Sequence, residues 1–294
     1  MTLALMKSYL LAFVLAASGA DAGNFPTEWT HGNADCARST DPPLQVHRFD
    51  ADTFILRQNK CVNSEGPFLY MLIGSSKALL LDTGAMPTAG GRLPLLATVD
   101  RILGEHGTAG MELVVAHSHA HTDHTYGDSQ FADRPRTTVV RPDVSSVMSF
   151  FRLQGASQGA SDFDLGGRVL TILAIPGHEA SHIAVYDAKT KILLTGDTAY
   201  PGLLTVRDWT AYCESAERLV KFTATHPVSH VLGAHIEMKR TPRNYYEPAT
   251  AFQPEEHSLP LAAKHLVEIR EVCQASGGSP RRDTRADFVV VPVP

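Results

Sequence analysis

The feature that most constrains this chain is a short run in which four histidines and one aspartate follow directly on an apolar segment. The segment 112–116 is apolar apart from its first residue, and His117-Ser-His-Ala-His-Thr-Asp-His124 comes immediately after it. Such a segment predicts a buried strand, whose end delivers these side chains into one loop. Imidazole and carboxylate groups are ligands that zinc prefers, so the run predicts a metal site at a strand end. The spacing His-x-His-x-Asp-His leaves His117 outside and selects His119, His121, Asp123 and His124.

The remaining sequence predicts two groups of short strands, each accompanied by helices. Short apolar runs between turn residues give expected strands at 44–49, 53–57, 68–73, 78–81, 112–116, 139–140, 168–175, 182–186, 192–194 and 228–232. A helical spacing of apolar residues gives expected helices at 93–106, 144–151, 210–225 and 259–273. Strands grouped in this way bury their apolar faces against each other, and helices cover the outer faces. The predicted fold class is therefore α/β, an αββα sandwich of two packed mixed β-sheets with outer helices.

Four further motifs stand at the ends of expected strands. They are Leu81-Asp82-Thr83-Gly84, Pro176-Gly177-His178, Thr195-Gly196-Asp197-Thr198 and Gly233-Ala234-His235. Together with the histidine run they form an ordered set of five motifs, which resembles the signature of the metallo-β-lactamase superfamily. The resemblance covers 44–235, and it implies that family's fold, its hydrolase chemistry and its two-metal site.

The resemblance implies a ligand role for seven residues. One metal would be held by His119, His121 and His178, the other by Asp123, His124 and His235, and Asp197 would bridge the two. The expected cofactor is a pair of Zn²⁺ ions, and other divalent metals accept the same donors. A hydroxide that bridges the metals would attack the substrate, while Asp123 orients this nucleophile and then passes a proton to the leaving group. Asp82 would organise the site without binding metal.

A second catalytic candidate, Tyr200, stands three positions after Asp197. In lactonases of the superfamily a tyrosine so placed hydrogen-bonds the substrate carbonyl, whereas glyoxalase II enzymes usually have phenylalanine there. The alternative for Tyr200 is a packing role. His117 and His182 are expected to be hydrogen-bonded neighbours of the ligands.

A carboxylate at position 197 resembles the glyoxalase II and lactonase branches and departs from true metallo-β-lactamases, which generally lack it. The expected function is therefore an exported binuclear metal-dependent hydrolase of a small ester, lactone or thioester. Two alternatives stay open, a β-lactamase-like amidase and a non-catalytic metal-dependent binding protein. All seven ligands are present, which disfavours the binding protein. Three cations beyond the last ligand either hold an anionic substrate or form a solvated turn, namely Lys239, Arg240 and Arg243.

Charge and the first residues restrict the partners and the compartment. The formal net charge is −5 and no basic stripe is visible, which favours a small-molecule substrate over nucleic acid. Lys7, an apolar run at 9–17 and Ala20-Asp21-Ala22 predict a signal peptide at 1–22, so we expect a secreted or periplasmic protein. The apolar run is shorter than the roughly 20 residues of a spanning helix, so no stable membrane insertion is expected after cleavage.

The chain is expected to have four parts. They are the signal peptide at 1–22, an irregular leader at 23–43, the catalytic domain at 44–240 and a C-terminal extension at 241–294 whose one helix packs on the core. An oxidising compartment favours disulfides among the four cysteines, and Cys36 with Cys61 is the preferred pair, although the sequence does not fix the pairing. Loops at 86–94, 150–164 and 200–209 are expected to shape the pocket, with a mobile lid at 155–161.

Overall fold

The computed structural model describes residues 28–153 and 159–294 of the chain. The expected signal peptide at 1–22 lies outside the described residues, as does 154–158 within the expected lid. The described part of the leader is irregular apart from one turn of 3₁₀ helix, η1 (Cys36–Arg38). No helix in the described ranges is long and apolar enough to cross a membrane.

The first sheet has six strands in sequence order. They are β1 (Leu44–Arg48), β2 (Thr53–Gln58), β3 (Phe68–Ile73), β4 (Lys77–Leu81), β5 (Glu112–Ala116) and β6 (Thr137–Val139). The first four strands pair antiparallel, as expected of hairpins, whereas β5 and β6 run parallel to β4. The helix α1 (Leu95–Glu105) makes the crossover between β4 and β5, so the two metal-motif segments that follow these strands leave the same edge of the sheet.

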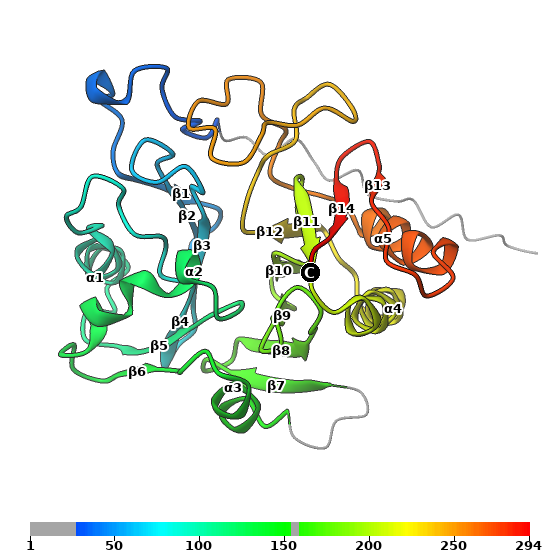
Figure 1. Cartoon of the computed structure of the whole chain (residues 1–294). Coiled ribbons are helices and arrows are strands. Elements are labelled where there is room, and N and C mark those ends of the chain that lie inside the picture. The colour runs from blue at the N-terminus through cyan, green and yellow to red at the C-terminus, as the bar shows by residue number, and fades with distance from the viewer. Residues whose placement is uncertain (1–27, 154–158) are drawn as a thin grey trace, which may run out of the picture.

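The second sheet has five strands in the order β12-β10-β9-β8-β7. They are β7 (Ala160–Asp164), β8 (Val169–Ala174), β9 (Ile183–Asp187), β10 (Ile192–Gly196) and β12 (His230–Gly233). One hydrophobic core joins the two sheets, with Leu72 and Val114 from the first and Leu170 and Ile183 from the second. Figure 1 shows the sheets facing each other with helices outside both. The expected αββα sandwich is confirmed.

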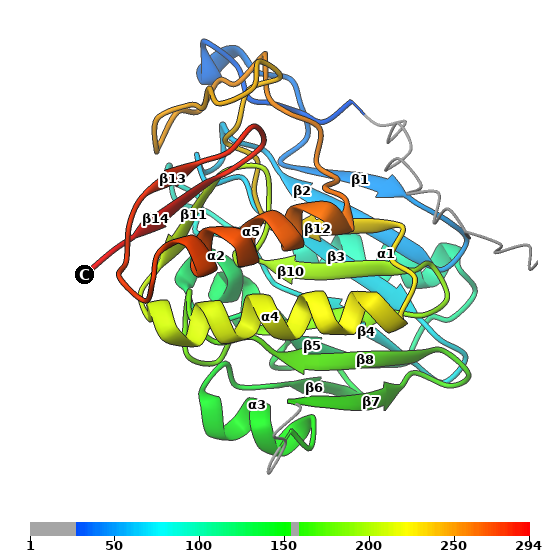
Figure 2. The ribbon, with the colours of Figure 1, turned by 90° about the vertical axis from the view of Figure 1, so that its right-hand side faces the viewer.

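The helices cover the outer faces through apolar stripes. Helix α1 buries Val99 and Ile102 against the first sheet. Helices α4 (Trp209–Thr225) and α5 (Ala263–Ala275) lie side by side over the second sheet, as Figure 2 shows. The shorter helices are α2 (Thr122–Thr125), η2 (Tyr126–Phe131) and α3 (Val144–Phe150). Helix α4 begins where the Asp208 carboxylate caps it by accepting from the Ala211 amide at 2.9 Å.

The C-terminal segment is tied to the core in two ways. A third sheet joins β11 (Leu203–Val206), β14 (Val289–Pro292) and β13 (Asp283–Thr284), in which β14 runs parallel to β11. The disulfide Cys213–Cys273 joins α4 to α5, and a second disulfide joins Cys36 to Cys61 as expected. The segment after 240 therefore packs on the second sheet through main-chain pairing as well as through its helix.

Two of the expected pocket loops contain strands, and a third strand forms near the C-terminus, where no strand was predicted. Residues 160–164, predicted to be a pocket loop and partly a mobile lid, form β7 and pair with β8, so the lid prediction was wrong for 160–161. Residues 203–206 form β11, and 289–292 form β14. These strands are short, and they lie at sheet edges or pair with segments distant in sequence. The local pattern of apolar residues therefore does not predict that they form. Helix α5 begins at 263 rather than 259 because Leu261 forms a bridge with Val231.

Candidate metal centre

The five motif segments each follow one strand, and their side chains converge. The segments come after β4, β5, β8, β10 and β12. Two groups result, in each of which the ligand atoms all lie within 4.8 Å of one another. The first group is His119, His121 and His178, and the second is Asp123, His124, Asp197 and His235. The structure thus brings all seven expected ligands together in the two expected groups.

The three imidazoles of the first group face one another through nitrogen atoms. His119 Nε2 lies 2.9 Å from His121 Nδ1, and His178 Nε2 lies 3.2 and 3.1 Å from these two atoms. Zinc bound tetrahedrally at about 2.05 Å would place its nitrogen ligands about 3.3 Å apart. The observed triangle is close to this size, so it fits a divalent cation of zinc's radius.

Asp197 lies between the two groups. Its Oδ2 is 3.5 Å from His178 Nε2 in the first group and 3.6 Å from His124 Nε2 in the second. Its Oδ1 is 3.4 Å from His235 Nε2. One carboxylate therefore reaches toward both groups, which is the position that a bridging ligand requires.

Hydrogen bonds outside the two groups fix which nitrogen of each imidazole faces inward. The Nδ1 of His178 donates to the Thr205 carbonyl at 2.8 Å, and the Nδ1 of His235 donates to the Glu65 carbonyl at 3.1 Å. A proton on Nδ1 leaves Nε2 with a free lone pair, which is the form that binds metal. These two partners could not be predicted from residue type, because every residue carries a backbone carbonyl.

Asp82 plays the same part for the second group. Its carboxylate accepts from Nδ1 of His124 at 3.0 Å, from the Ser118 amide at 2.7 Å and from the Ser118 hydroxyl at 3.0 Å. Its backbone has a φ of 70°, in the left-handed region that Asp and Asn tolerate better than most residues. The aspartate of the Asp-Thr-Gly motif thus positions a ligand from outside the ligand set.

Buried polar atoms without partners mark the centre of the second group. Among the described residues, Nε2 of His124 and Oδ1 of Asp197 are buried and make no hydrogen bond. Unsatisfied buried polar atoms are costly, and native proteins rarely keep them without a partner. Both atoms face the other members of the group. The donor set and its orphaned atoms therefore fit a bound cation.

Most charges of the two groups suit a metal site. The exceptions are His124 and His235, where burial opposes protonation but neighbouring carboxylates raise the pKa, to about 9 for His235, so a cation that binds there displaces their protons. Burial opposes ionisation of Asp123, but the neighbouring His124 and His235 outweigh it and hold its pKa far below the usual range. Burial likewise opposes ionisation of Asp197, and the same two histidines keep its pKa low. Burial lowers the pKa of His119 well below 6.5, and its neighbouring histidines add to this effect. Ionised carboxylates and a neutral imidazole are the protonation states that metal ligation needs.

Tyr200 lies beside the second group with its hydroxyl turned toward β11. The side chain is buried, and its ring centre is 5.6 Å from that of His235. Its hydroxyl donates to the Leu203 carbonyl at 2.8 Å and lies 3.3 Å from an oxygen of Glu237. Glu237 also accepts from the Leu203 amide at 2.7 Å. This geometry satisfies the hydroxyl inside the protein, and a role of Tyr200 on the substrate stays a prediction.

The remaining histidines near the cluster are hydrogen-bonded neighbours. The Asp197 amide donates to His182 Nε2 at 3.2 Å, so the proton of His182 lies on Nδ1, which is 2.8 Å from the Thr198 hydroxyl. His117 Nε2 lies 2.8 Å from Asp128 Oδ1. His182 therefore steadies the bridging position, whereas His117 belongs to neither group.

Two of the three cations after His235 contact the segment 254–255 through their side chains, and the third is held through its backbone. Lys239 Nζ lies 3.9 Å from a Glu255 oxygen, and Arg240 donates to the Pro254 carbonyl at 2.9 Å. The backbone amide of Arg243 donates to the Ala286 carbonyl. These contacts favour the turn interpretation over an anion site.

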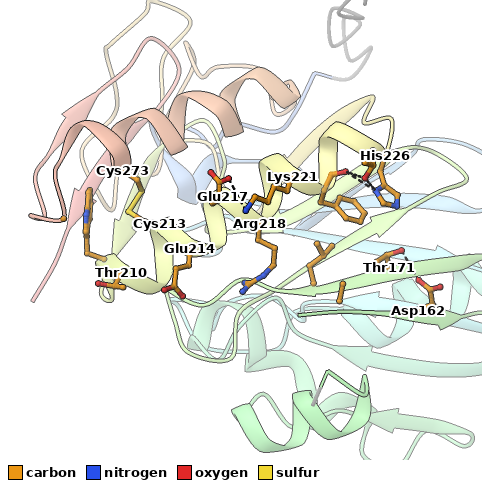
Figure 3. A pocket seen from close by; sticks show the side chains of 16 residues that line it. Asp162, Thr171, Thr210, Cys213, Glu214, Glu217, Arg218, Lys221, His226 and Cys273 are labelled. Carbon is orange, nitrogen blue, oxygen red and sulfur yellow. Dashed lines mark hydrogen bonds and ion pairs between the residues drawn. A yellow bond between two sulfur atoms is a disulfide. The ribbon is translucent and has the colours of Figure 1, made fainter. Parts of the chain in front are cut away.

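A large groove of about 1050 Å³ lies on the outer side of the second sheet, between α4 and the strands β7 and β8. Figure 3 shows its mixed lining, in which Lys221 pairs with Glu217 at 3.4 Å and the disulfide of Cys213 closes one end. None of the seven ligands lines it. The Arg218 guanidinium donates to the Ala174 carbonyl, and the groove is separate from the metal centre.

Comparison with known proteins decides the family. The model of the family described as the metallo-β-lactamase superfamily matches residues 66–235, which is more than half of the 294 residues. The chain belongs to the metallo-β-lactamase superfamily. The match ends at His235, the last expected ligand, so all five motifs fall inside it, whereas the strands β1 and β2 precede it.

Curated members of the superfamily are similar to this chain over part of their length. Acyl-coenzyme A thioesterase MBLAC2 of Gallus gallus is 28% identical over 209 residues, which cover 60% of this chain and 75% of that protein. The human protein of the same name is 30% identical, with 54% and 62% covered. Hydroxyacylglutathione hydrolase of Synechococcus sp. (strain JA-2-3B'a(2-13)) is 31% identical, with 36% and 42% covered. The chain thus spans less than two thirds of the latter two, and it is a metallo-hydrolase of this superfamily.

Solved structures show the same fold. DIM-1 metallo-β-lactamase exposed to ceftazidime has a TM-score of 0.53 and 16% identity, covering 80% of this chain and 98% of that one. FIM-1 metallo-β-lactamase from Pseudomonas aeruginosa in the mono-zinc form has a TM-score of 0.55 and 12% identity, covering 82% and 99%. At these identities the likeness concerns the fold alone, and it agrees with the sandwich described above.

Proposed function

We propose that this chain is an exported hydrolase that uses two zinc ions to cleave a small thioester, ester or lactone. The observation that carries the proposal is the position of Asp197, whose carboxylate reaches both His178 and His235 at 3.5 and 3.4 Å. A carboxylate shared in this way supports two cations held side by side. The relatives named acyl-coenzyme A thioesterase and hydroxyacylglutathione hydrolase support acyl transfer to water and make thioesters the first class to test.

The seven ligands divide the work of holding the metals. His119, His121 and His178 would hold one, Asp123, His124 and His235 the other, and Asp197 both. When bound, two divalent cations supply the Lewis acidity that ionises water near neutral pH and polarises a carbonyl. Asp82, Thr205 and Glu65 keep the ligand nitrogens turned inward through the hydrogen bonds described above.

Asp123 is the proposed proton carrier. Its Oδ2 lies 3.1 Å from His124 Nε2 and 3.3 Å from His235 Nε2, and its side chain is 21% exposed, the most open of the carboxylates at the centre. The other oxygen, Oδ1, would accept a proton from the attacking water. The same oxygen then returns the proton to the departing sulfur or oxygen atom of the substrate. Its low pKa is consistent with a base that is ionised before the reaction begins.

The test combines metal content with turnover. Purified full chain is analysed for bound metals and assayed on an S-hexanoyl thioester, p-nitrophenyl hexanoate, an N-hexanoyl homoserine lactone and a chromogenic cephalosporin. We expect two zinc ions per chain and a preference for the first three substrates. Asp197→Asn should lose metal and turnover, while the matched variant Asp162→Asn, at the distant groove, should keep both.

Each other outcome has a definite meaning. Preference for the cephalosporin would replace the proposal by a β-lactamase-like amidase. A fully loaded protein that turns over none of the four would favour the binding protein. Export is tested separately by N-terminal sequencing of protein recovered outside the cytoplasm, where a start at Gly23 supports the expected cleavage and an intact Met1 contradicts it.

A further inference from the structure

A second, smaller cavity lies beside the first metal group. It has a volume of about 330 Å³, and its lining includes Gly177, Glu179, Ala180, Arg207, Asp208 and Ala211. Gly177 and Glu179 flank the ligand His178 in the chain. We call this space the Arg207 cavity. It is large enough for a charged group of a few heavy atoms, and no step of the mechanism above uses it.

Three charged side chains line the Arg207 cavity, and two of them are already satisfied. The Glu179 carboxylate accepts from the amide and the hydroxyl of Ser181 at 2.7 and 2.6 Å. The Asp208 carboxylate caps α4 by accepting from the Ala211 amide. In contrast, the guanidinium of Arg207 makes no hydrogen bond or ion pair with any other residue in the described ranges, although it is exposed at the cavity.

The backbone of Arg207 is fixed relative to the metal centre. Its amide donates to the Gly177 carbonyl at 3.0 Å, directly before the ligand His178. Two residues earlier, the Thr205 carbonyl accepts from the same ligand. The guanidinium therefore belongs to a residue whose backbone is held against the segment that carries the first-group ligand His178.

We propose that Arg207 forms an anion-binding subsite that holds a carboxylate or phosphate carried by the substrate while its carbonyl lies at the metals. This rests on the proposed function and narrows it to anionic thioesters or esters. An unpaired guanidinium offers two parallel donors to such a group, and a charge-assisted bond of this kind is among the stronger polar contacts. The carboxylates of Glu179 and Asp208 are held by neutral donors and give the lining a formal charge of −1 together with Arg207, so an anion would be bound by direct contact with the guanidinium, which suits a single anionic group rather than a polyanion.

The kinetic test uses matched thioesters. S-hexanoyl-3-mercaptopropionate carries its anion on the leaving group, S-adipoyl-2-mercaptoethanol carries it on the acyl group, and S-hexanoyl-3-mercaptopropanol is neutral. For Arg207→Met we expect kcat/KM to fall about 10-fold or more on one of the two anionic compounds, mainly through KM, with the neutral one within about 2-fold. The compound affected identifies the side of the substrate that bears the anion.

Two further variants make the result specific. Arg207→Lys keeps the charge and should restore part of the loss, as a point charge replaces a fork of donors. Arg101→Met removes an exposed arginine from α1, where Arg101 pairs with Glu105, and should change none of the three rates. Equal effects of Arg207→Met on anionic and neutral thioesters, or no effect on any, would overturn the proposal.

A binding measurement separates this proposal from the proposed function. N-hexanoyl-β-alanine and N-hexanoyl-3-aminopropanol are amide analogues that differ only in the anion, and calorimetry gives their affinity for zinc-loaded protein. We expect the carboxylate to bind more tightly, and this preference to vanish in Arg207→Met. If no thioester is hydrolysed but the preference is present, the proposed function fails and the subsite stands. Turnover without any preference refutes the subsite alone.

Discussion

Replacing Asp82 by asparagine should weaken metal binding at the second position about 10- to 100-fold while leaving the fold intact. Asp82 is 1% exposed and has a φ of 70°, a conformation that asparagine also tolerates. The amide keeps one oxygen for the Ser118 amide but presents an NH₂ group to Nδ1 of His124, which now lies 3.0 Å from a carboxylate oxygen. Two donors cannot face each other, so His124 must move its proton to Nε2, the atom that faces the metal.

The magnitude follows from the contacts that are lost. Loss of an outer partner typically weakens metal affinity by about 10- to 100-fold, or about 1.4–2.7 kcal/mol. One hydrogen bond between charged and polar groups contributes about 1.5–3 kcal/mol, so we expect metal-free Asp82→Asn to unfold more easily by about that amount. Chelator competition and metal analysis should show one tightly bound zinc per chain instead of two, and thioester turnover should fall with the second metal.

A matched control is available at Asp128. Its Oδ1 lies 2.8 Å from Nε2 of His117, the histidine that belongs to neither metal group. Asp128→Asn makes the same chemical change beside an imidazole and should leave both metals in place. Two zinc ions with unchanged affinity in Asp82→Asn would refute the tautomer argument, and equal metal loss in both variants would show a general loosening instead.

Three other predictions concern stability and metal removal. Tyr200→Phe should lower the free energy of unfolding by about 1 kcal/mol, because the hydrogen bond to the Leu203 carbonyl is lost, and should leave kcat nearly unchanged. A fall of about 100-fold in kcat at unchanged stability would instead show that the hydroxyl binds the substrate carbonyl. Burial, aided by the positive charge of Arg57, lowers the pKa of Lys60 to about 8, so between pH 8 and 10.5 the unfolded chain binds more protons and stability rises with pH. The free energy of unfolding of the wild type should rise by about 3 kcal/mol over that interval relative to that of Lys60→Met. A difference between the two proteins that stays constant with pH would contradict the pKa assigned to Lys60. Chelation should lower the melting temperature, and added zinc should restore it in a concentration-dependent way. A melting temperature that changes with neither would show that the metals do not stabilise the folded state.

The chemistry-bearing residues were readable from the sequence because metal ligation restricts residue type. His119 and Asp197 stand in short motifs after apolar strands, and no other side chains serve as well at those points. Strands inside the core, such as β5, were readable for a similar reason, since their apolar runs are continuous. The apolar runs therefore predicted the sandwich, and the ordered motifs carried the resemblance that implied the two ligand groups.

Other parts of the site depend on contacts that residue type does not encode. The partners of His178 and His235 are main-chain carbonyls, and one of them lies on β11, a strand that pairs with a segment more than 80 residues later. The direction of the Tyr200 hydroxyl depends on Glu237 and Leu203, which only folding brings near. The lining of the Arg207 cavity is likewise assembled from two segments about 30 residues apart.

The pairing of β14 with β11 ties the first metal group to a strand far along the chain. Thr205, whose carbonyl orients His178, is itself paired with Val291. Without that neighbour, β11 would have an unpaired edge in the third sheet, and the carbonyl that orients His178 would be held less firmly. A truncation or a bulky fusion that displaces β14 would therefore weaken the first metal position before it disturbed the core between the two large sheets.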